Sequence, residues 1–273
     1  MTLEDVQGRP DTRGIPLDEA GVTGLRYPVT VTDRAGAKQE SIGEATMAVA
    51  VPAETKGTHM SRFVEILHDH ATDVSATTMP VILDVICQRL AAPQARLQIR
   101  VTYFRERFAP VSQARSLMGY DAAWSATTHG TSTRLDLEVR VPVTSVCPCS
   151  KAISDYGAHN QRGHITMRVR QADSAEPLWI EDLIDIAENS GSAPVYPLLK
   201  RPDERYVTMQ AYDNPVFVED MARTVAQQLR DDPRVAAFNV HVANDESIHD
   251  HAAFASVAWP RTSTLDYLGW AQR

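Results

Sequence analysis

The chain has little of what marks several large classes of protein. It contains only three cysteines in 273 residues, too few for a disulfide framework. No stretch approaches the roughly eighteen consecutive apolar residues that a membrane helix needs, and the first five residues show no apolar leader. We therefore expect a soluble, cytoplasmic protein with reduced thiols and no membrane partner.

Positive charge is also in deficit. The 27 lysines and arginines are outnumbered by 35 aspartates and glutamates, which gives a formal net charge of -8. A nucleic-acid-binding surface must neutralise phosphates, so we expect no nucleic-acid partner. An anionic small molecule would have to be held by a local basic cluster. The hydrophobic content of 43% is that of a globular protein with a substantial core.

The periodicity of the chain gives the same order of elements twice. Alternating runs predict strands, and amphipathic runs predict helices. In the first half the strands fall at 24–32, 44–52, 96–108 and 117–128, and the helices at 60–72 and 78–91. In the second half the strands fall at 134–146, 164–170, 235–242 and 252–259, and the helices at 177–189 and 214–230. Pro-Val-Thr recurs at 28–30 and 142–144, in the first strand of each half.

This repetition predicts an α+β fold built from two tandem ββααββ modules with antiparallel sheets. We place a flexible N-terminal arm at residues 1–20, the first module at 21–129, and the second at 130–260, with a turn at 128–131. A C-terminal segment, 261–273, is too apolar to be a free tail. Sheets with open edges favour association of several copies into a barrel, with active sites at the interfaces.

The densest group of reactive side chains follows the strand predicted at 134–146. Pro148 cannot continue the hydrogen-bonding ladder, so Cys147 and Cys149 come where the chain leaves the sheet. A disulfide between thiols one residue apart would be strained. Two packing residues are the alternative, but the loop position favours a thiolate that acts as a metal ligand or nucleophile.

Histidines add to this group. His159 lies across a predicted hairpin from Cys147, and one thiolate with one imidazole suits a zinc- or iron-like ion, although a lone loop histidine is usually only solvated. His249 would supply a further ligand, and in an extended chain it shares one side with His251. The same His-Asp-His tripeptide occurs at 68–70 on a predicted helix, so the tripeptide alone is a weak signal, and we assign no metal there.

Two further segments carry charged residues that could bind a ligand. The segment 196–208, expected to be an irregular link between helices, contains Lys200, Arg201 and Arg205. It is either a solvated loop or a phosphate clamp, and Glu204 within it could complete a Cys-His-Glu-His ligand set. Glu219 stands in the first turn of an amphipathic helix, where the helix dipole alone favours a carboxylate. In a cleft, the same group could accept two hydrogen bonds from a guanine edge.

Together these motifs resemble the type IB GTP cyclohydrolases. The resemblance rests on PVTSVCPCSK at 142–151 with YGAHNQR at 156–162, on PVYPLLKRPDE at 194–204, and on NP with FVED at 214–220 and ESIH at 246–249. It implies the tunnelling fold, a homo-oligomer (a tetramer) around a β-barrel, and conversion of GTP and water to 7,8-dihydroneopterin triphosphate and formate, the first committed step toward tetrahydrofolate.

The resemblance also implies roles for individual residues. A divalent metal (Mn, Zn or Fe) would be held by Cys147, His159, Glu204 and His249. Glu219 would anchor guanine, Glu246 would support proton transfer, and Cys147 and His159 would act in catalysis. Lys200, Arg201 and Arg205 are our candidates for the triphosphate.

Two other interpretations use the same residues. The nitrile reductases of the same superfamily, which use NADPH, would employ Cys147 as a nucleophile, but their Glu-Ser-Lys-Ser type of motif is not found in this sequence. A structural zinc or redox-sensing protein would use the Cys-Pro-Cys pair, but closed zinc sites usually have four Cys or His ligands, and the basic segment would then lack a purpose.

Overall fold

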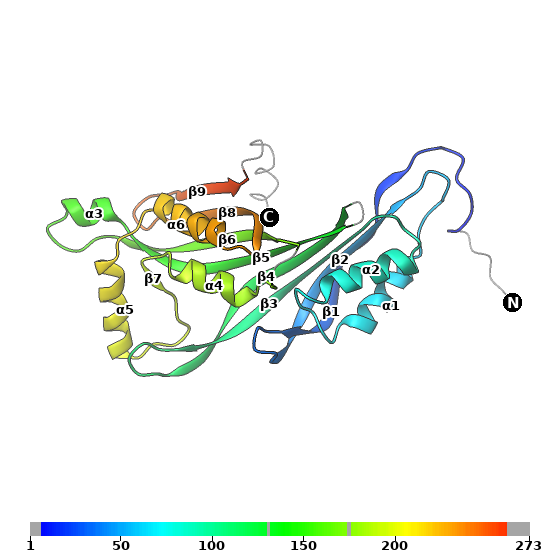
Figure 1. The fold of residues 1–273 in the computed structure, drawn as a ribbon. Helices are drawn as coiled ribbons and strands as arrows, with labels where there is room; N and C mark the ends of the chain where they lie inside the picture. The colour runs from blue at the N-terminus through cyan, green and yellow to red at the C-terminus, as the bar shows by residue number, and fades with distance from the viewer. Residues whose placement is uncertain (1–6, 130–131, 174–175, 261–273) are drawn as a thin grey trace. The chain divides into compact units, whose positions relative to one another are not determined.

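The computed structural model describes residues 7–129, 132–173 and 176–260, apart from the His129 side chain. In these ranges it is an α+β structure with antiparallel strands and short helices (Figure 1). The predicted turn at 128–131 lies partly outside them, and the predicted segment 261–273 lies wholly outside. No helix that the structure describes is both long enough and apolar enough to cross a membrane.

Every predicted strand and helix overlaps an observed one. The strands are β1 Leu17–Thr32, β2 Lys38–Val51, β3 Ala95–Phe108, β4 Arg115–His129, β5 Ser132–Val146, β6 Asn160–Gln171, β7 Ala193–Pro194, β8 Val235–Asp245 and β9 Ala252–Trp259. Hydrogen-bonded neighbours follow the order β1-β2-β3-β4-β5-β6-β8-β9, and β7 pairs with β5. The helices are α1 Met60–His70, α2 Met79–Arg89, α3 Pro148–Ile153, α4 Ile180–Glu188, α5 Arg201–Asp213 and α6 Val218–Asp231.

The chain forms two compact units. Unit 1 comprises 1–103, 121–137 and 177–179, and unit 2 comprises 104–120, 138–176 and 180–273. Strand β1 begins within the segment that we expected to be a flexible arm. The division into modules at 21–129 and 130–260 stays a prediction.

In unit 1 two helices cover one face of the first strands (Figure 1). β2 pairs with both β1 and β3 in antiparallel register, with Met47 opposite Leu97. Side chains of one face are buried because alternate residues of a strand point to the same side. The buried residues on this side of the strands include Val31, Met47, Leu97 and Ile99. Those of α1 and α2 include Phe63, Ile66, Ile82, Leu83 and Ile86.

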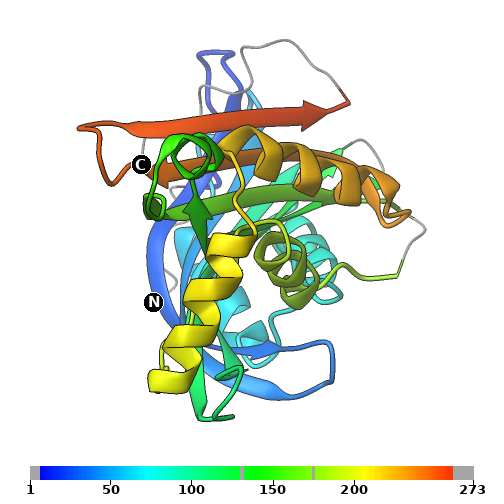
Figure 2. The same cartoon turned by 90° about the vertical axis from the view of Figure 1, so that its left-hand side faces the viewer.

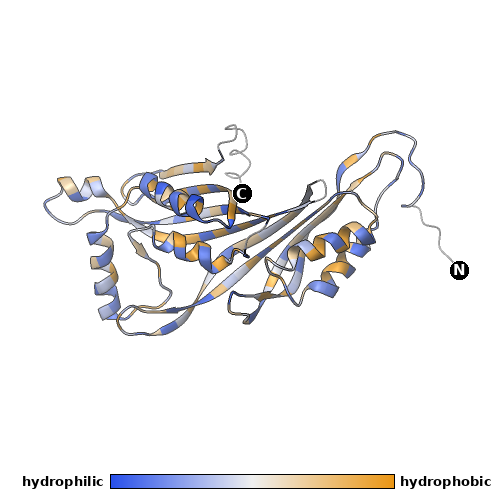
Figure 3. Cartoon of the chain, in the orientation of Figure 1, coloured by the Kyte–Doolittle hydropathy of each residue, from blue (hydrophilic) through white to orange (hydrophobic). Residues whose placement is uncertain are grey.

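In unit 2 helix α6 packs against β8 (Figure 2). Strand β8 pairs with β6 on one side and β9 on the other. Figure 3 shows apolar and polar residues alternating along these strands, as a half-buried sheet requires. The core is made by the apolar stripe of α6 and the inward residues of β6 and β8, namely Met221, Val225, Leu229, Ile165, Met167, Val240 and Val242.

The expectation of an irregular link at 196–208 is wrong from Arg201 onward, where α5 begins. Pro202 lies in the first turn of this helix, where its missing N–H costs no intrahelical hydrogen bond. The helix carries no apolar stripe, because its only buried residues are Asp203 and Ala211. Periodicity could therefore not reveal it.

A buried ionic cluster joins β3 and β4 to α4 in unit 2. The Tyr120 hydroxyl donates to Glu188 Oε1 at 2.8 Å, and Arg107 Nη1 lies 2.7 Å from Glu188 Oε2. Burial raises the pKa of Glu188, and the charge of Arg107 opposes that shift. Burial, with the neighbouring carboxylate, also raises the pKa of Tyr120. Burial of the Glu188 carboxylate is thus compensated by both Tyr120 and Arg107.

Replacing Tyr120 by phenylalanine should destabilise the protein by about 1–3 kcal/mol, because it leaves a buried carboxylate oxygen without its donor. Urea denaturation measures this. Tyr156→Phe is the control, because the Tyr156 side chain is 92% exposed. Equal stability of the two variants would show that Glu188 does not need the phenol.

Candidate functional site

Cys147 stands at the point where β5 ends and α3 begins. Its backbone is extended (φ −71°, ψ 119°), and its Sγ accepts a hydrogen bond from the Ser150 N–H at 3.4 Å. Cys147 is half-buried, whereas Cys149 on the helix itself is exposed, and both are free thiols. The two cysteines therefore have different surroundings, with Cys147 fixed in a turn.

His159 lies directly beside this turn, as the predicted hairpin requires. The Cys147 N–H donates to the His159 carbonyl at 3.1 Å, and the His159 N–H donates to Ser150 Oγ at 3.2 Å. On the ring, Nδ1 is 2.8 Å from Gln161 Oε1. An amide oxygen only accepts, so Nδ1 donates in this contact, and in the neutral ring the lone pair is then on Nε2. His159 thus has one nitrogen available to a ligand.

Gln161 reaches toward the segment after β8. It is buried, and the Ser247 hydroxyl donates to the same Oε1 at 3.5 Å. Half-buried Glu246 precedes Ser247, and exposed His249 follows two residues later. The rings of His249 and His251 stack with centroids 5.1 Å apart, so these side chains share one side as predicted. This segment therefore lies close to His159.

A buried chain of hydrogen bonds joins three segments of the site. Asn244 Nδ2 donates to Ser145 Oγ at 3.0 Å, and Ser145 Oγ donates to the Val216 carbonyl at 2.9 Å. The Val216 N–H in turn donates to the Val146 carbonyl at 3.1 Å. We call this connected set, Asn244, Ser145, Val216 and Val146, the junction. The segments that carry Cys147, Glu219 and Glu246 all begin next to it.

Gly163 makes room for this junction. It is the register partner of Asn244 across β6 and β8, and a Cβ there would lie 2.3 Å from Asn244 Oδ1. Only glycine leaves space for the amide at this position. Sequence reasoning missed Ser145, Gln161 and Asn244. The one local signal was the spacing of Gln161, two residues after His159 and so on the same side of a strand.

The charged candidates lie on α5 and α6. Lys200 is the N-cap of α5, and Arg201, Glu204 and Arg205 are exposed in its first turns. Glu219 is exposed in the first turn of α6. The other end of α5 is attached to α3, because the Lys151 ammonium donates to the Tyr212 carbonyl and lies 4.2 Å from the centre of its ring.

The predicted ligands are only partly assembled. In the ranges that the structure describes, no group of three or more His, Cys, Asp and Glu side chains is close enough to hold a metal ion. The structure joins Cys147 to His159 and brings the segment of Glu246 near them. It records no hydrogen bond from the Glu204 or His249 side chains to either. The set Cys147, His159, Glu204 and His249 stays a prediction.

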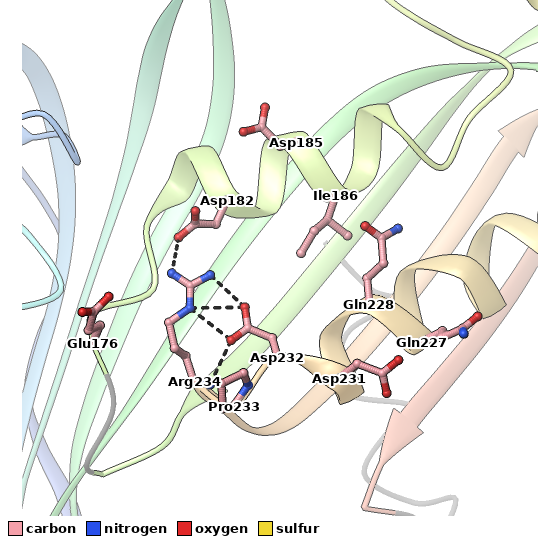
Figure 4. A pocket seen from close by; sticks show the side chains of 10 residues that line it. All are labelled: Glu176, Asp182, Asp185, Ile186, Gln227, Gln228, Asp231, Asp232, Pro233 and Arg234. Carbon is pink, nitrogen blue, oxygen red and sulfur yellow. Dashed lines mark hydrogen bonds and ion pairs between the residues drawn. The ribbon is translucent and has the colours of Figure 1, made fainter.

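A groove of about 1100 Å³ lies elsewhere in unit 2, between α4, α6 and the turn before β8 (Figure 4). Arg234 in it is held by Asp182 at 2.8 Å and Asp232 at 2.7 Å. The other charged groups that line it are acidic, namely Glu176, Asp185 and Asp231. It contains none of the predicted site residues, and its charge disfavours a phosphorylated ligand.

Replacing Asn244 by alanine should lower the free energy of unfolding by about 1–3 kcal/mol, because Ser145 loses a buried partner. Chemical denaturation measures the loss. Asn239→Ala is the control on the same strand, half-buried and outside the junction. Equal losses in both variants would mean that the junction contributes no more than an average asparagine of β8.

Comparison with known proteins gives one consistent result. The family model described as type I GTP cyclohydrolase FolE2 matches residues 3–255. A GTP cyclohydrolase FolE2 of Methylococcus capsulatus is 49% identical over 257 residues, which cover 94% of this chain and 95% of that protein. One of Nitrosococcus oceani is 46% identical, covering 93% and 94%, and one of Geobacter sp. is 47% identical, covering 96% and 97%.

Solved structures share the fold at low sequence identity. The uricase of Arthrobacter globiformis aligns with a TM-score of 0.54 and 8% identity, over 92% of this chain and 97% of its own. A thermostable uricase variant aligns with a TM-score of 0.56 and 9% identity, over 92% and 95%. At this identity the likeness concerns the fold alone.

Proposed function

The chain belongs to the FolE2 family of type I GTP cyclohydrolases and is itself a GTP cyclohydrolase; we propose that it converts GTP and water to 7,8-dihydroneopterin triphosphate and formate, in folate biosynthesis. The observation that carries the site assignment is the junction at the end of β5. There the segments of Cys147, His159, Glu246 and Glu219 leave from one connected set of hydrogen bonds. The family match spans all of them. The family relationship also decides against the nitrile reductase interpretation.

We infer that a divalent ion, Mn, Zn or Fe, binds at Cys147 and His159. The donors fit such an ion, because a cysteine thiolate and an imidazole with a free Nε2 are ligands that zinc and iron accept. The bond from Nδ1 to Gln161 holds the ring as a partner of a metal-bound histidine usually does. Glu204 and His249 would complete the set. When bound, the ion supplies Lewis acidity for attack of water on C8 of guanine.

The free nitrogen of His159 also limits its role. Because Nδ1 donates to Gln161, both ligation and proton transfer would have to use Nε2. One nitrogen cannot do both at once, so we assign proton transfer to Glu246. This carboxylate is half-buried and next to Ser247, which contacts Gln161. Glu246 would then transfer the proton, and His159 would remain a ligand through Nε2.

The residues proposed to bind the substrate lie at the N-terminal ends of α5 and α6. The Glu219 carboxylate would accept hydrogen bonds from the N1–H and the 2-amino group of guanine. The exposed cations Lys200, Arg201 and Arg205 would bind the triphosphate at the positive end of α5. A local cluster of this kind lets a protein of net charge -8 hold a polyanion.

We further propose a cytoplasmic homo-oligomer, a tetramer built from two ββααββ modules per chain around a β-barrel, with active sites near the interfaces. Exposed apolar side chains of unit 2 support association, among them Phe104 on β3 and Leu117 on β4, which are 43% and 64% exposed. A fully active monomer in light scattering would rule this assembly out.

Cys147→Ala should abolish formate release from GTP in the presence of Mn(II) or Zn(II), and should lower the bound metal measured by elemental analysis. Cys149→Ala is the matched control and should retain both. Pterin fluorescence after oxidation gives a second measure of product. The opposite pattern, with Cys149 essential and Cys147 dispensable, would assign the site to the wrong thiol.

Glu219→Gln should raise KM for GTP by about tenfold or more, because it removes hydrogen bonds to a charged acceptor. The preference for GTP over inosine triphosphate, which lacks the 2-amino group, should shrink as well. Asp220→Asn in the same helical turn is the control, since Asp220 pairs with Arg223. An unchanged preference in Glu219→Gln would place the guanine elsewhere.

A further inference from the structure

Asp203 is a buried carboxylate on a helix that is otherwise exposed at this end. Its exposed fraction is 0%, and four donors surround it. Oδ1 accepts from the N–H groups of Val111 and Ser112, both at 2.8 Å. Oδ2 accepts from the Ser112 hydroxyl at 2.6 Å and from the Lys200 N–H at 2.8 Å. A carboxylate has about four acceptor positions, so its capacity is filled.

These donors come from two segments far apart in sequence. Val111 and Ser112 form the tip that joins β3 to β4, and Lys200 is the N-cap of α5. The tip is itself fixed, because the Ala109 N–H donates to the Ala114 carbonyl at 3.0 Å and the Gln113 N–H donates back to Ala109 at 3.1 Å. Asp203 therefore fastens the start of α5 to a rigid turn.

Asp203 remains charged in this position. Burial by itself would raise its pKa, but the hydrogen bonds from Ser112, Lys200 and Val111 outweigh burial and hold the pKa below the usual range. The contact is therefore an anion surrounded by donors, which is stronger than a neutral contact.

No buried apolar side chain of the described first turn of α5 accompanies Asp203. Ala211, near the other end, packs in a cluster with Val146 and Ala193, whereas Asp203 is the only buried residue in the first turns. A second contact from β3 lies just upstream, where the Arg107 guanidinium stands 5.1 Å from the centre of the Tyr196 ring. The β3–β4 hairpin thus holds both the approach to α5 and its first turn.

We propose that Asp203 is a positioning residue for the triphosphate of the substrate, holding Lys200, Arg201 and Arg205 in place by docking α5 on the tip of the β3–β4 hairpin. The proposal rests on the proposed function, because it takes these cations as the phosphate ligands. It gives a role to a hairpin tip that carries none of the predicted site residues.

Two variants test it. In Asp203→Asn, one oxygen becomes an NH₂ group, so whichever way the amide turns, a donor faces other donors. Ser112→Ala removes one donor and keeps the rest. Asp213→Asn is the control, an exposed carboxylate at the last position of the same helix. We expect Asp203→Asn to raise KM for GTP and the Kd of inorganic tripolyphosphate by about tenfold, with a smaller rise for Ser112→Ala and none for Asp213→Asn.

Tripolyphosphate binding is measured by calorimetry without turnover, so it separates this proposal from the proposed function. If the wild-type protein binds tripolyphosphate but releases no formate from GTP, the proposed activity is wrong and the positioning role of Asp203 is not contradicted. Folded variants whose KM and tripolyphosphate affinity equal those of the wild type overturn the positioning role, as does a loss confined to kcat. If Asp203→Asn does not fold, the affinity of Ser112→Ala decides by the same criterion.

Discussion

The end of strand β5 is the constraint on which the site depends. Pro148 has no N–H to donate, so the ladder stops, and the last buried backbone groups of the strand must find other partners. The Val146 N–H donates to Ser192 Oγ at 2.9 Å, and its carbonyl accepts from the Val216 N–H at 3.1 Å. These bonds fix where the chain passes before α5 and before α6. The two backbone hydrogen bonds of Val146 thus connect the segment of Cys147 to the one that leads to Glu219.

Different interactions hold the two ends of α5, and the difference affects how its cations can meet an anionic ligand. At the C-terminal end, Ala211 packs with apolar neighbours and Lys151 binds the Tyr212 carbonyl. At the N-terminal end, a carboxylate surrounded by donors does the same work without apolar residues. The cations of the first turns can then remain exposed to an anion. An apolar stripe on the same turns would have competed with them for space.

Sequence patterns predicted those parts of the molecule in which local spacing carries the information. Half-buried strands alternate, so every described strand except the two-residue β7 was predicted. The hairpin that joins Cys147 to His159 followed from the strand ends, but the short helix α3 within it was missed. Helix α5 was missed because its buried face is one aspartate and one alanine. The pair Ser145–Asn244 was missed because its members lie 99 residues apart, and local periodicity carries no information on contacts at that separation. The four-ligand metal set was predicted from the chemistry of the four side chains and from the family resemblance, and neither gives the distances between them.

The ligands proposed for the metal are of two kinds, and the difference affects how the four side chains could come together. Cys147 and His159 are half-buried, and backbone hydrogen bonds and Gln161 fix them, so their order is supplied by folding. Glu204 and His249 are exposed, and among the described residues no hydrogen bond joins either of these side chains to Cys147 or His159. If these two side chains join the proposed site, bringing them to Cys147 and His159 requires free energy from outside their own segments. In the proposed assembly, a neighbouring copy or the ion itself would provide it. Because Asp203 is next to Glu204, the contact of Asp203 with the β3–β4 hairpin also limits where the Glu204 carboxylate can reach.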